Sequence, residues 1–351
     1  MKLIITKIKS SFITQFLLTS AFANVVVFII LLKKIFIEKI KINYKYFLFI
    51  FFFVTSYLIT FNFLFLRTLA LISFTLIIID YLKKTRDNNN LYLIFYLHTL
   101  IILATILSPS LNQLLVGEKF NSIRFSGLIP GFDFVPLFYS VFVITLLIKN
   151  NFILNFKTVI LFLISFAIII LSGRFGLIYM LYILFLFLLK KSNLKTLLIL
   201  IVISAITFIL FKERIEFVYY TFNALYNSII NLDVNAFENL NYSDEYYSSS
   251  PLTLIYELTI PFRNISSYFF PSNSFKFLDP GISYYIINLG LIISIFIYMY
   301  FFNLFKNFNK KYLYYLVPLI LCDIKFQSIF VTMPMFWVMY NINYLSINNE
   351  S

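Results

Sequence analysis

Cysteine is almost absent from this chain, since Cys322 is the only one among 351 residues. A single thiol excludes an intramolecular disulfide and any metal site built from cysteines. Histidine is equally rare, because only His98 occurs, and a metal-binding helix with paired histidines is excluded with it. The sequence therefore predicts no metal site and no cofactor.

Charge is also scarce. Only 12% of the residues are charged and 61% are hydrophobic, whereas soluble domains carry about 25% charge. A water-solvated globule is thus excluded. Long apolar runs between lysine clusters predict an all-α polytopic integral membrane protein, because in lipid only helices or closed barrels satisfy every backbone polar group. The runs are continuous rather than alternating, which favours helices over a barrel.

Nucleotide-binding and nucleic-acid-binding patterns are missing as well. The chain has no Walker-type phosphate loop, no G-x-G-x-x-G after a strand and no DNA-binding signal. ATP hydrolysis, a Rossmann module for nucleotide sugars and nucleic-acid partners are therefore not expected.

The apolar runs predict about eleven transmembrane helices, at roughly 20 residues each, within a single polytopic domain of residues 1–351. The runs are Phe12–Leu32, Tyr46–Leu82, Leu91–Leu107, Phe134–Ile148, Val159–Leu171, Phe175–Leu189, Thr196–Phe211, Ser283–Phe302, Tyr312–Ile324 and Ile329–Ile342. Phe12–Leu32 predicts one retained helix, because its apolar residues continue past a signal-peptidase-like Ala21-Phe22-Ala23. Tyr46–Leu82 predicts a hairpin that turns near Phe61. After Leu91–Leu107, Ser108-Pro109-Ser110 predicts a loop to about Asp133.

Lysine clusters occur at alternate connections, which predicts their side of the membrane. The clusters comprise Lys33, Lys34, Lys39, Lys41 and Lys45; Lys83, Lys84 and Arg86; Lys149 and Lys157; Lys190, Lys191 and Lys195; and Lys306, Lys310 and Lys311. We expect them to be cytoplasmic, although the N-terminal lysines do not fit this alternation. The large segment Lys212–Ile282 then faces the periplasm or exterior. It is acidic, with four basic and eight acidic residues, and contains eight tyrosines.

Arginine follows a different distribution from lysine. Only six of the 28 basic residues are arginines, and Arg86 alone is on the predicted cytoplasmic side, while Arg67 belongs to the hairpin. The other four lie at or beyond the predicted outer ends of helices, namely Arg124, Arg174, Arg214 and Arg263. A guanidinium group binds phosphate through two parallel hydrogen bonds, so the pattern suits a diphosphate at the membrane surface. The alternative is that these side chains reach the lipid interface or pair with loop acids.

Several acidic and neutral groups have two interpretations. Asp133 and Asp279 lie at the outer mouths of predicted spans, where each could orient an arginine, accept a proton or cap a helix. His98 lies inside an apolar run and is either a general base or a hydrogen-bonded structural residue. Asp244-Glu245 could bind a cation, but no ligand spacing supports this, and a solvated acidic loop is the favoured interpretation.

Three ordered stretches together resemble the O-antigen polymerase and ligase superfamily of membrane glycosyltransferases. Arg124–Pro130 (RFSGLIP) is similar to the family's R-x-S-G loop, and Leu171–Gly176 (LSGRFG) to its S-G-S/R-R-x-G turn. Asp279–Leu291 (DPGISYYIINLGL) is similar to the end of the family's large outer loop. Ligases of this superfamily place a histidine in that loop. Residues 212–282 contain none, which favours a polymerase.

The resemblance implies a GT-C-like, metal-independent enzyme in the cytoplasmic membrane with an outward-facing active site. It would join polyprenyl-diphosphate-linked oligosaccharide repeat units into a surface polysaccharide. Arg174, Arg214, Arg263 and Asp279 would take part in catalysis, and Arg124, Asp133, Tyr284 and Asn288 would contact the substrate. Membrane lipids are expected partners, and whether a chain-length regulator protein also binds stays open.

Two other activities fit the same residues less well. An O-antigen ligase would need the missing loop histidine. A flippase for lipid-linked oligosaccharides predicts short loops and pseudo-symmetric halves, and the chain has a loop of about 70 residues and no visible repeat.

The predicted topology is testable with reporter fusions. Alkaline phosphatase joined after Asp244 should be active, because the enzyme folds only outside the cytoplasm, whereas a fusion after Lys191 should be inactive. The reverse pattern for green fluorescent protein provides the control. Fluorescence from the Asp244 fusion would overturn the orientation.

Overall fold

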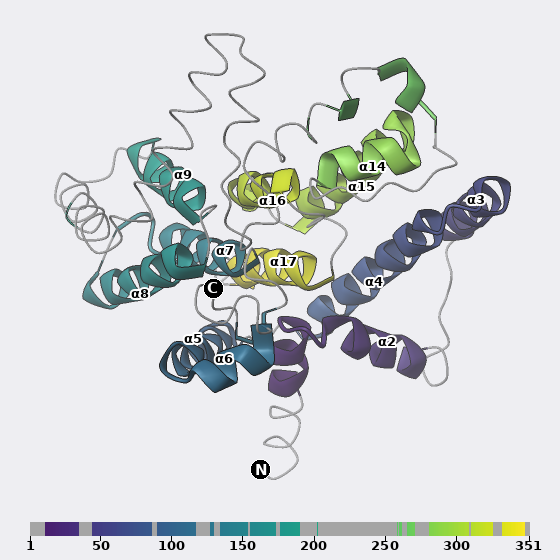
Figure 1. The fold of residues 1–351 in the computed structure, drawn as a ribbon. Helices are drawn as coiled ribbons and strands as arrows, with labels where there is room; N and C mark the ends of the chain where they lie inside the picture. Colours follow the sequence, from purple (N-terminus) through teal and green to yellow (C-terminus); the bar gives the residue numbers. More distant parts are fainter. Residues whose placement is uncertain are drawn as a thin grey trace, which may run out of the picture.

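The computed structural model describes residues 11–34, 44–85, 90–116, 127–129, 134–153, 155–172, 176–189, 202, 258, 260–261, 265–270, 281–308, 310–325 and 332–347. Every regular element within these ranges is a helix (Figure 1). The predicted all-α fold class is therefore confirmed for the described part of the chain. The predicted span Thr196–Phe211 and most of the segment 212–282 lie outside it.

The helices with assigned bounds span residues 23–347. In chain order they are α2 (Ala23–Lys33), α3 (Tyr44–Thr60), α4 (Leu64–Lys84), α5 (Leu91–Leu107), α6 (Pro109–Val116), α7 (Phe134–Lys149), α8 (Phe156–Ser172), α9 (Gly176–Leu189), α14 (Gly281–Leu289), α15 (Leu291–Phe308), α16 (Leu313–Lys325) and α17 (Thr332–Ile347). Two short 3₁₀ turns, Ile265–Tyr268 and Lys310–Tyr312, accompany them. The bounds of α5 and α7 to α9 agree with the apolar runs to within about three residues, because apolar runs flanked by polar residues mark helix ends well.

Helix α7 is the centre of the bundle. Every residue of Val135–Ile148 is buried, as expected for a helix that is apolar on all sides. It packs against α8, α9, α16 and α17, and Figure 1 shows α8 and α9 on one side of it, with α4, α14 and α15 on the other. Trp337 of α17 stacks on Phe138 with ring centroids 3.9 Å apart, and its indole N–H donates to the Phe138 carbonyl at 2.7 Å.

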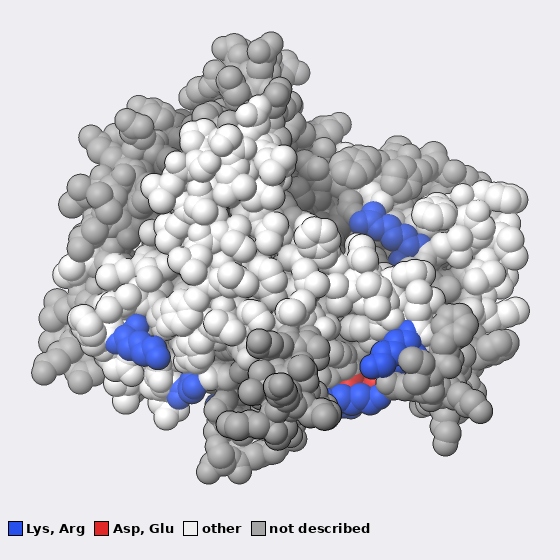
Figure 2. Space-filling view, turned by 90° about the horizontal axis from the view of Figure 1, so that it is seen from below, with Lys and Arg blue, Asp and Glu red and all other residues white. Residues whose placement is uncertain are grey.

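The outer surface of the bundle is largely apolar. Exposed large side chains include Leu100, Phe185 and Phe296, and the face in Figure 2 carries few charged groups among its described residues. By length and hydropathy, α4 qualifies as a membrane-crossing helix. Helices α5 and α6 would be a second if this pair, bent by 118°, forms one span. The other apolar helices of the described part that this test identifies are shorter.

The expected hairpin is present between α3 and α4. Phe61 turns the chain with a left-handed φ of 52°, and it is followed by Asn62, whose side-chain oxygen accepts the backbone N–H of Leu64 at 3.0 Å. This side-chain acceptor satisfies one of the free N–H groups at the start of α4.

The first apolar run is not the single helix that the sequence predicted. Residues 11–18 are helical, a turn follows at 19–22, and α2 begins at Ala23. At the break, the hydroxyls of Thr19 and Ser20 donate to the carbonyls of Phe16 and Leu17 at 2.7 and 2.8 Å. Hydroxyl side chains that bond to nearby carbonyls compete with the helical backbone pattern, which apolar composition alone does not reveal.

The predicted loop after Leu107 was also wrong in part, because Pro109–Val116 forms α6. Ser108 is extended (φ −125°, ψ 99°), as a residue before proline prefers. Its hydroxyl accepts the N–H of Leu111 at 3.4 Å, and proline is well tolerated in the first turn of a helix. The same Ser-Pro pair that ends α5 thus starts α6.

The predicted span Ser283–Phe302 is divided at Gly290 into α14 and α15. Gly290 has a φ of +86°, which L-residues other than glycine rarely adopt. A Cβ built on it would lie 2.8 Å from the carbonyl oxygen of Phe269 and 2.8 Å from the carbonyl carbon of Phe270. Gly290 therefore both ends α14 and lets the segment after the 3₁₀ turn at 265–268 pack against it.

Gly290→Ala should lower stability by at least about 1–2 kcal/mol, the cost of a left-handed L-residue, with the close backbone contact adding to it. Thermal unfolding of the detergent-purified chain measures this effect. Ala104→Ser adds one atom at an exposed position of α5 and should leave the melting temperature within about 1 °C of wild type. Equal melting of Gly290→Ala and wild type would contradict the assigned turn.

Candidate functional site

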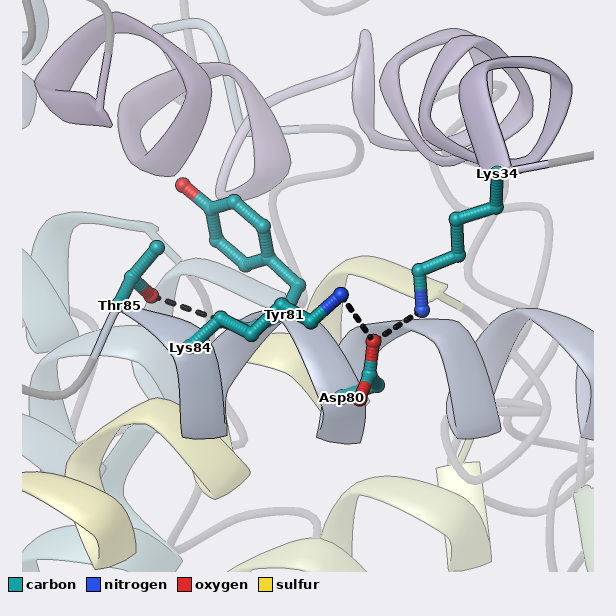
Figure 3. A network of polar contacts seen from close by, with 5 residues as sticks. All are labelled: Lys34, Asp80, Tyr81, Lys84 and Thr85. Atoms are coloured by element: carbon teal, nitrogen blue, oxygen red, sulfur yellow. Dashed lines mark hydrogen bonds and ion pairs between the residues drawn. The ribbon is translucent and has the colours of Figure 1, made fainter. Parts of the chain in front are cut away.

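One end of the bundle gathers lysines around an acidic group. Lys34, just after α2, donates to the Asp80 carboxylate of α4, and the amine of Lys84 lies 3.5 Å from the same oxygen (Figure 3). The hydroxyl of Thr85 donates to the Tyr81 carbonyl at 2.9 Å, beyond the last turn of α4. These contacts join the C-terminal ends of α2 and α4.

A chain of polar contacts continues from this lysine-rich end across the bundle. The Tyr81 hydroxyl contacts the Ser11 carbonyl at 3.5 Å, and the Gln15 side chain binds both Asn90 and Tyr340 at 2.9 Å. Tyr340 in turn accepts the backbone N–H of Asn90 at 2.8 Å. The start of α5 and the later part of α17 therefore lie beside the C-terminal end of α4.

A second pair of lysines belongs to the same region. The amine of Lys149 lies 5.3 Å from the ring centre of Tyr92 and 4.9 Å from that of Tyr344. The amine of Lys157 lies 5.4 Å from the Tyr92 ring. Amines over aromatic faces are stabilised by the ring quadrupole. The C-terminal end of α7 and the start of α8 therefore lie beside the start of α5.

Six of the eight residues predicted to form the site lie outside the described residues. These are Arg124, Asp133, Arg174, Arg214, Arg263 and Asp279. Tyr284 and Asn288 are described, and both are buried on α14. The geometry of the predicted site can therefore be followed from α14 alone.

Helix α14 is tied to the turn between α3 and α4. The amide group of Asn288 donates to the Tyr284 carbonyl at 2.8 Å, and the side chain of Asn62 donates to the Asn288 carbonyl at 2.9 Å. Tyr284 also interacts through its hydroxyl with the side chain of Arg67, the fourth residue of α4. Of the two described site residues, Tyr284 thus contacts an arginine that the sequence had assigned only to the hairpin.

A buried carboxylate lies at the other end of α14. Asp323 of α16 is fully buried and accepts the hydroxyl of Tyr298 from α15. A Cβ built on Gly281 would lie 2.5 Å from its Oδ1 atom, so α14 begins directly against the carboxylate. The charges of both Asp323 and Arg67 also act on the hydroxyl of Tyr285. We call Asn62, Arg67, Tyr284, Tyr285, Asn288, Tyr298 and Asp323 the α14 polar cluster.

The other two sequence motifs are only partly described. Gly127 of the first motif has a φ of 57°, and a Cβ there would lie 3.1 Å from Ile102 of α5. The Leu128 carbonyl accepts the N–H of Ala21 at 2.9 Å, so this motif packs where the first apolar run breaks. A Cβ built on Gly176 of the second motif would lie 2.3 Å from the Ile169 carbonyl oxygen. The absence of a side chain there lets the start of α9 pack closely against α8.

His98 is enclosed in the core rather than placed beside α14. Its Nε2 atom lies 2.8 Å from the Thr19 hydroxyl, and the rings of Phe16 and Phe138 both have centroids 4.8 Å away. Its Nδ1 atom has no hydrogen-bond partner within the described residues. Of the two interpretations left open by the sequence, these contacts favour a structural histidine.

Two charged members of the cluster were missing from the predicted site. Asp323 interrupts the apolar run of α16, and a carboxylate within such a run is costly unless it has partners, so the sequence itself contains a signal for this residue. Arg67 differs, because its partner Tyr284 lies more than 200 residues along the chain. Within the described residues, no three His, Cys, Asp or Glu side chains gather as a metal site would require.

Comparison with models of protein families, with curated proteins and with solved structures finds no match to the chain.

Asp323→Ala should destabilise the chain by about 1–3 kcal/mol, because it leaves the Tyr298 hydroxyl without this acceptor in a buried site. Tyr298→Phe removes the same hydrogen bond from the other side and should also destabilise the chain, because the buried carboxylate loses this donor. Thermal unfolding of the single and double variants measures the coupling between the two residues. Tyr96→Phe removes a hydroxyl from an exposed side chain and serves as the control. Additive losses from Asp323→Ala and Tyr298→Phe would show that the pair is not coupled.

Proposed function

We propose that this chain is a membrane glycosyltransferase that polymerises polyprenyl-diphosphate-linked oligosaccharide repeat units into a surface polysaccharide. It would cross the cytoplasmic membrane about eleven times and act at the outer face. The proposal is supported by the three ordered motifs, by the arginines at predicted outer helix ends and by the apolar exterior of the bundle.

The arrangement of charge supports a membrane-embedded bundle with two unlike ends. Lys34 and Lys84 lie at one end of α4, together with Asp80, whereas Arg67 lies near the other. Thirteen residues of α-helix separate Arg67 from Asp80, a rise of about 20 Å. Lysine near the cytoplasmic interface and arginine near the outer one is the distribution that the proposal requires.

The observation that carries the proposal is the position of α14. This helix begins where the large predicted outer loop ends, and it contains Tyr284 and Asn288 of the third motif. Through them it contacts Asn62 and Arg67 at the start of α4. The end of the loop therefore lies close to a cationic group at the end of α4 remote from Lys34 and Lys84, as a site for a diphosphate needs.

The proposed reaction exchanges one bond at the reducing-end sugar of the growing glycan. The bond from its anomeric carbon to the diphosphate breaks, and a bond to a hydroxyl oxygen of a new lipid-linked repeat unit forms. The polyprenyl diphosphate leaves with the electron pair, and the hydroxyl loses its proton. Arg124 and Arg174 would hold the donor diphosphate, while Arg214 and Arg263 would bind the second substrate or offset the charge that develops on the leaving group.

The proton acceptor is assigned to Asp279 rather than His98. Asp279 precedes Gly281, the first residue of α14, by two positions. His98, in contrast, is fully buried between Phe16 and Phe138, so an acceptor hydroxyl could not approach it without displacing core side chains.

Deletion of the gene distinguishes the proposed activity from its two rivals. Loss of a polymerase leaves surface glycan that carries a single repeat unit, because transfer to the final acceptor continues. Loss of a ligase leaves no capped material, and loss of a flippase retains the lipid-linked unit inside the membrane. A gel of the surface polysaccharide distinguishes these outcomes, and complementation by the intact gene is the control. Only the single-unit pattern supports the proposal.

Arg174→Lys and Arg263→Ala should abolish polymer in the complementation assay, while membrane levels of the protein stay normal. The lysine variant retains the charge but loses the planar fork that binds two phosphate oxygens. Arg86→Lys is the matched control, since this arginine lies on the predicted cytoplasmic side, and it should restore a normal ladder. Normal ladders from both test variants would refute the roles assigned to these arginines.

A further inference from the structure

Arg67 is the only arginine among the described residues, and its guanidinium group is placed unusually. The side chain is exposed on α4, in the part of the helix that precedes a long apolar stretch. It forms no ion pair with any carboxylate of the described residues. A cation on an apolar surface is costly without a counter-ion. An anion from outside the chain would therefore be stabilised beside Arg67.

The one acidic member of the α14 polar cluster, Asp323, forms no ion pair with Arg67. Asp323 and Arg67 both interact electrostatically with Tyr285. The Asp323 carboxylate is fully buried, and it accepts a hydrogen bond from the Tyr298 hydroxyl. Tyr284 provides the polar contact to the guanidinium. Arginine offers five N–H donors, and one hydroxyl oxygen can accept only some of them. As far as the described residues show, N–H donors of Arg67 thus remain for a ligand.

The surface beside Arg67 is apolar. Phe63 lies one turn earlier, since the N–H of Arg67 donates to its carbonyl at 3.1 Å, and Ala70 is exposed almost one turn later. Residues at this spacing share one face of a helix. Phe61 and Phe63 expose 78% and 69% of their surfaces. The face therefore combines one cation with an apolar stripe, which suits an anionic group attached to a hydrocarbon chain.

We propose that Arg67, oriented by Tyr284, binds a phosphate group of the polyprenyl diphosphate, whose prenyl chain lies along the Phe63–Ala70 face of α4. This inference rests on the proposed function and adds to it a position on α4 for one lipid-linked substrate. Asn62 and Asn288 connect the turn before α4 to the last turn of α14, so the ligand would also stabilise the contact between these two helices.

Binding can be measured on the detergent-purified full-length chain with farnesyl diphosphate as the probe. Wild type should bind it, and Arg67→Gln should weaken binding about ten- to a hundredfold, the range expected when hydrogen bonds to a charged group are lost. Arg67→Lys should recover only part of the affinity, because the ammonium group cannot form two parallel hydrogen bonds. Tyr284→Phe should weaken binding by less than Arg67→Gln does. Lys83→Gln, at an exposed position near the far end of α4, removes an equal charge and should bind as wild type does.

Competitors test the chemistry of the ligand. Inorganic pyrophosphate should compete weakly, because it lacks the chain, and dioleoyl phosphatidylglycerol should compete weakly, because it lacks the diphosphate. Equal affinity of Arg67→Gln and wild type would overturn the proposal. So would phosphatidylglycerol that competes as well as farnesyl diphosphate, since the face would then be an ordinary phospholipid contact, or pyrophosphate that competes equally, since the chain would then contribute nothing.

The same variants separate this inference from the proposed function. If deletion of the gene gives the single-unit pattern but Arg67→Gln binds the probe normally, the polymerase proposal stands and the Arg67 site fails. If deletion leaves the polysaccharide unchanged while probe binding still depends on Arg67, the binding site stands and the polymerase proposal fails.

Discussion

Complete burial of α7 is the constraint on which the rest of the bundle depends. A helix whose residues from Val135 to Ile148 are all enclosed must be covered on every side, and α8, α9, α16 and α17 cover it. Polar atoms inside this contact need partners, since a buried group without one is expensive. Thr145 meets this need, with its hydroxyl 2.7 Å from the side-chain oxygen of Asn341 and 2.8 Å from the Tyr315 hydroxyl.

Once this core is set, α16 positions α14, and α14 defines the candidate site. Asp323 lies near the end of α16 and receives the start of α14 at Gly281, where no side chain could fit. Gly290 then ends α14 after nine residues and turns the chain into α15. Two glycines and one carboxylate thus hold Tyr284 against Arg67. Within the polar cluster, Asn62, Asn288, Tyr298 and Asp323 form hydrogen bonds to one another or to the backbone of α14, which lowers the cost of burying polar groups.

The candidate site could be predicted only where its signal is local. Tyr284 and Asn288 belong to a motif that is recognisable within 13 residues, and six further site residues belong to segments that the structure does not describe. Arg67 could not be assigned in the same way, because its partner comes from a distant helix. Asp323 was within reach, since a carboxylate inside an apolar run is itself a signal, but hydropathy averaged over the run concealed it.

Apolar composition and the spacing of polar breaks determined by themselves that this chain is helical, where α5 and α7 to α9 begin and end, and that α3 and α4 form a hairpin. These features follow from local preferences and from the length of each apolar run. The tertiary structure alone decided that the first run breaks at Thr19 and Ser20 and that Arg67 lies beside Tyr284. Arg67 reaches Tyr284 only because α4 and α14 pack together, and at the break the Thr19 hydroxyl also contacts His98 of α5. Hydropathy along the sequence does not encode such contacts between distant residues.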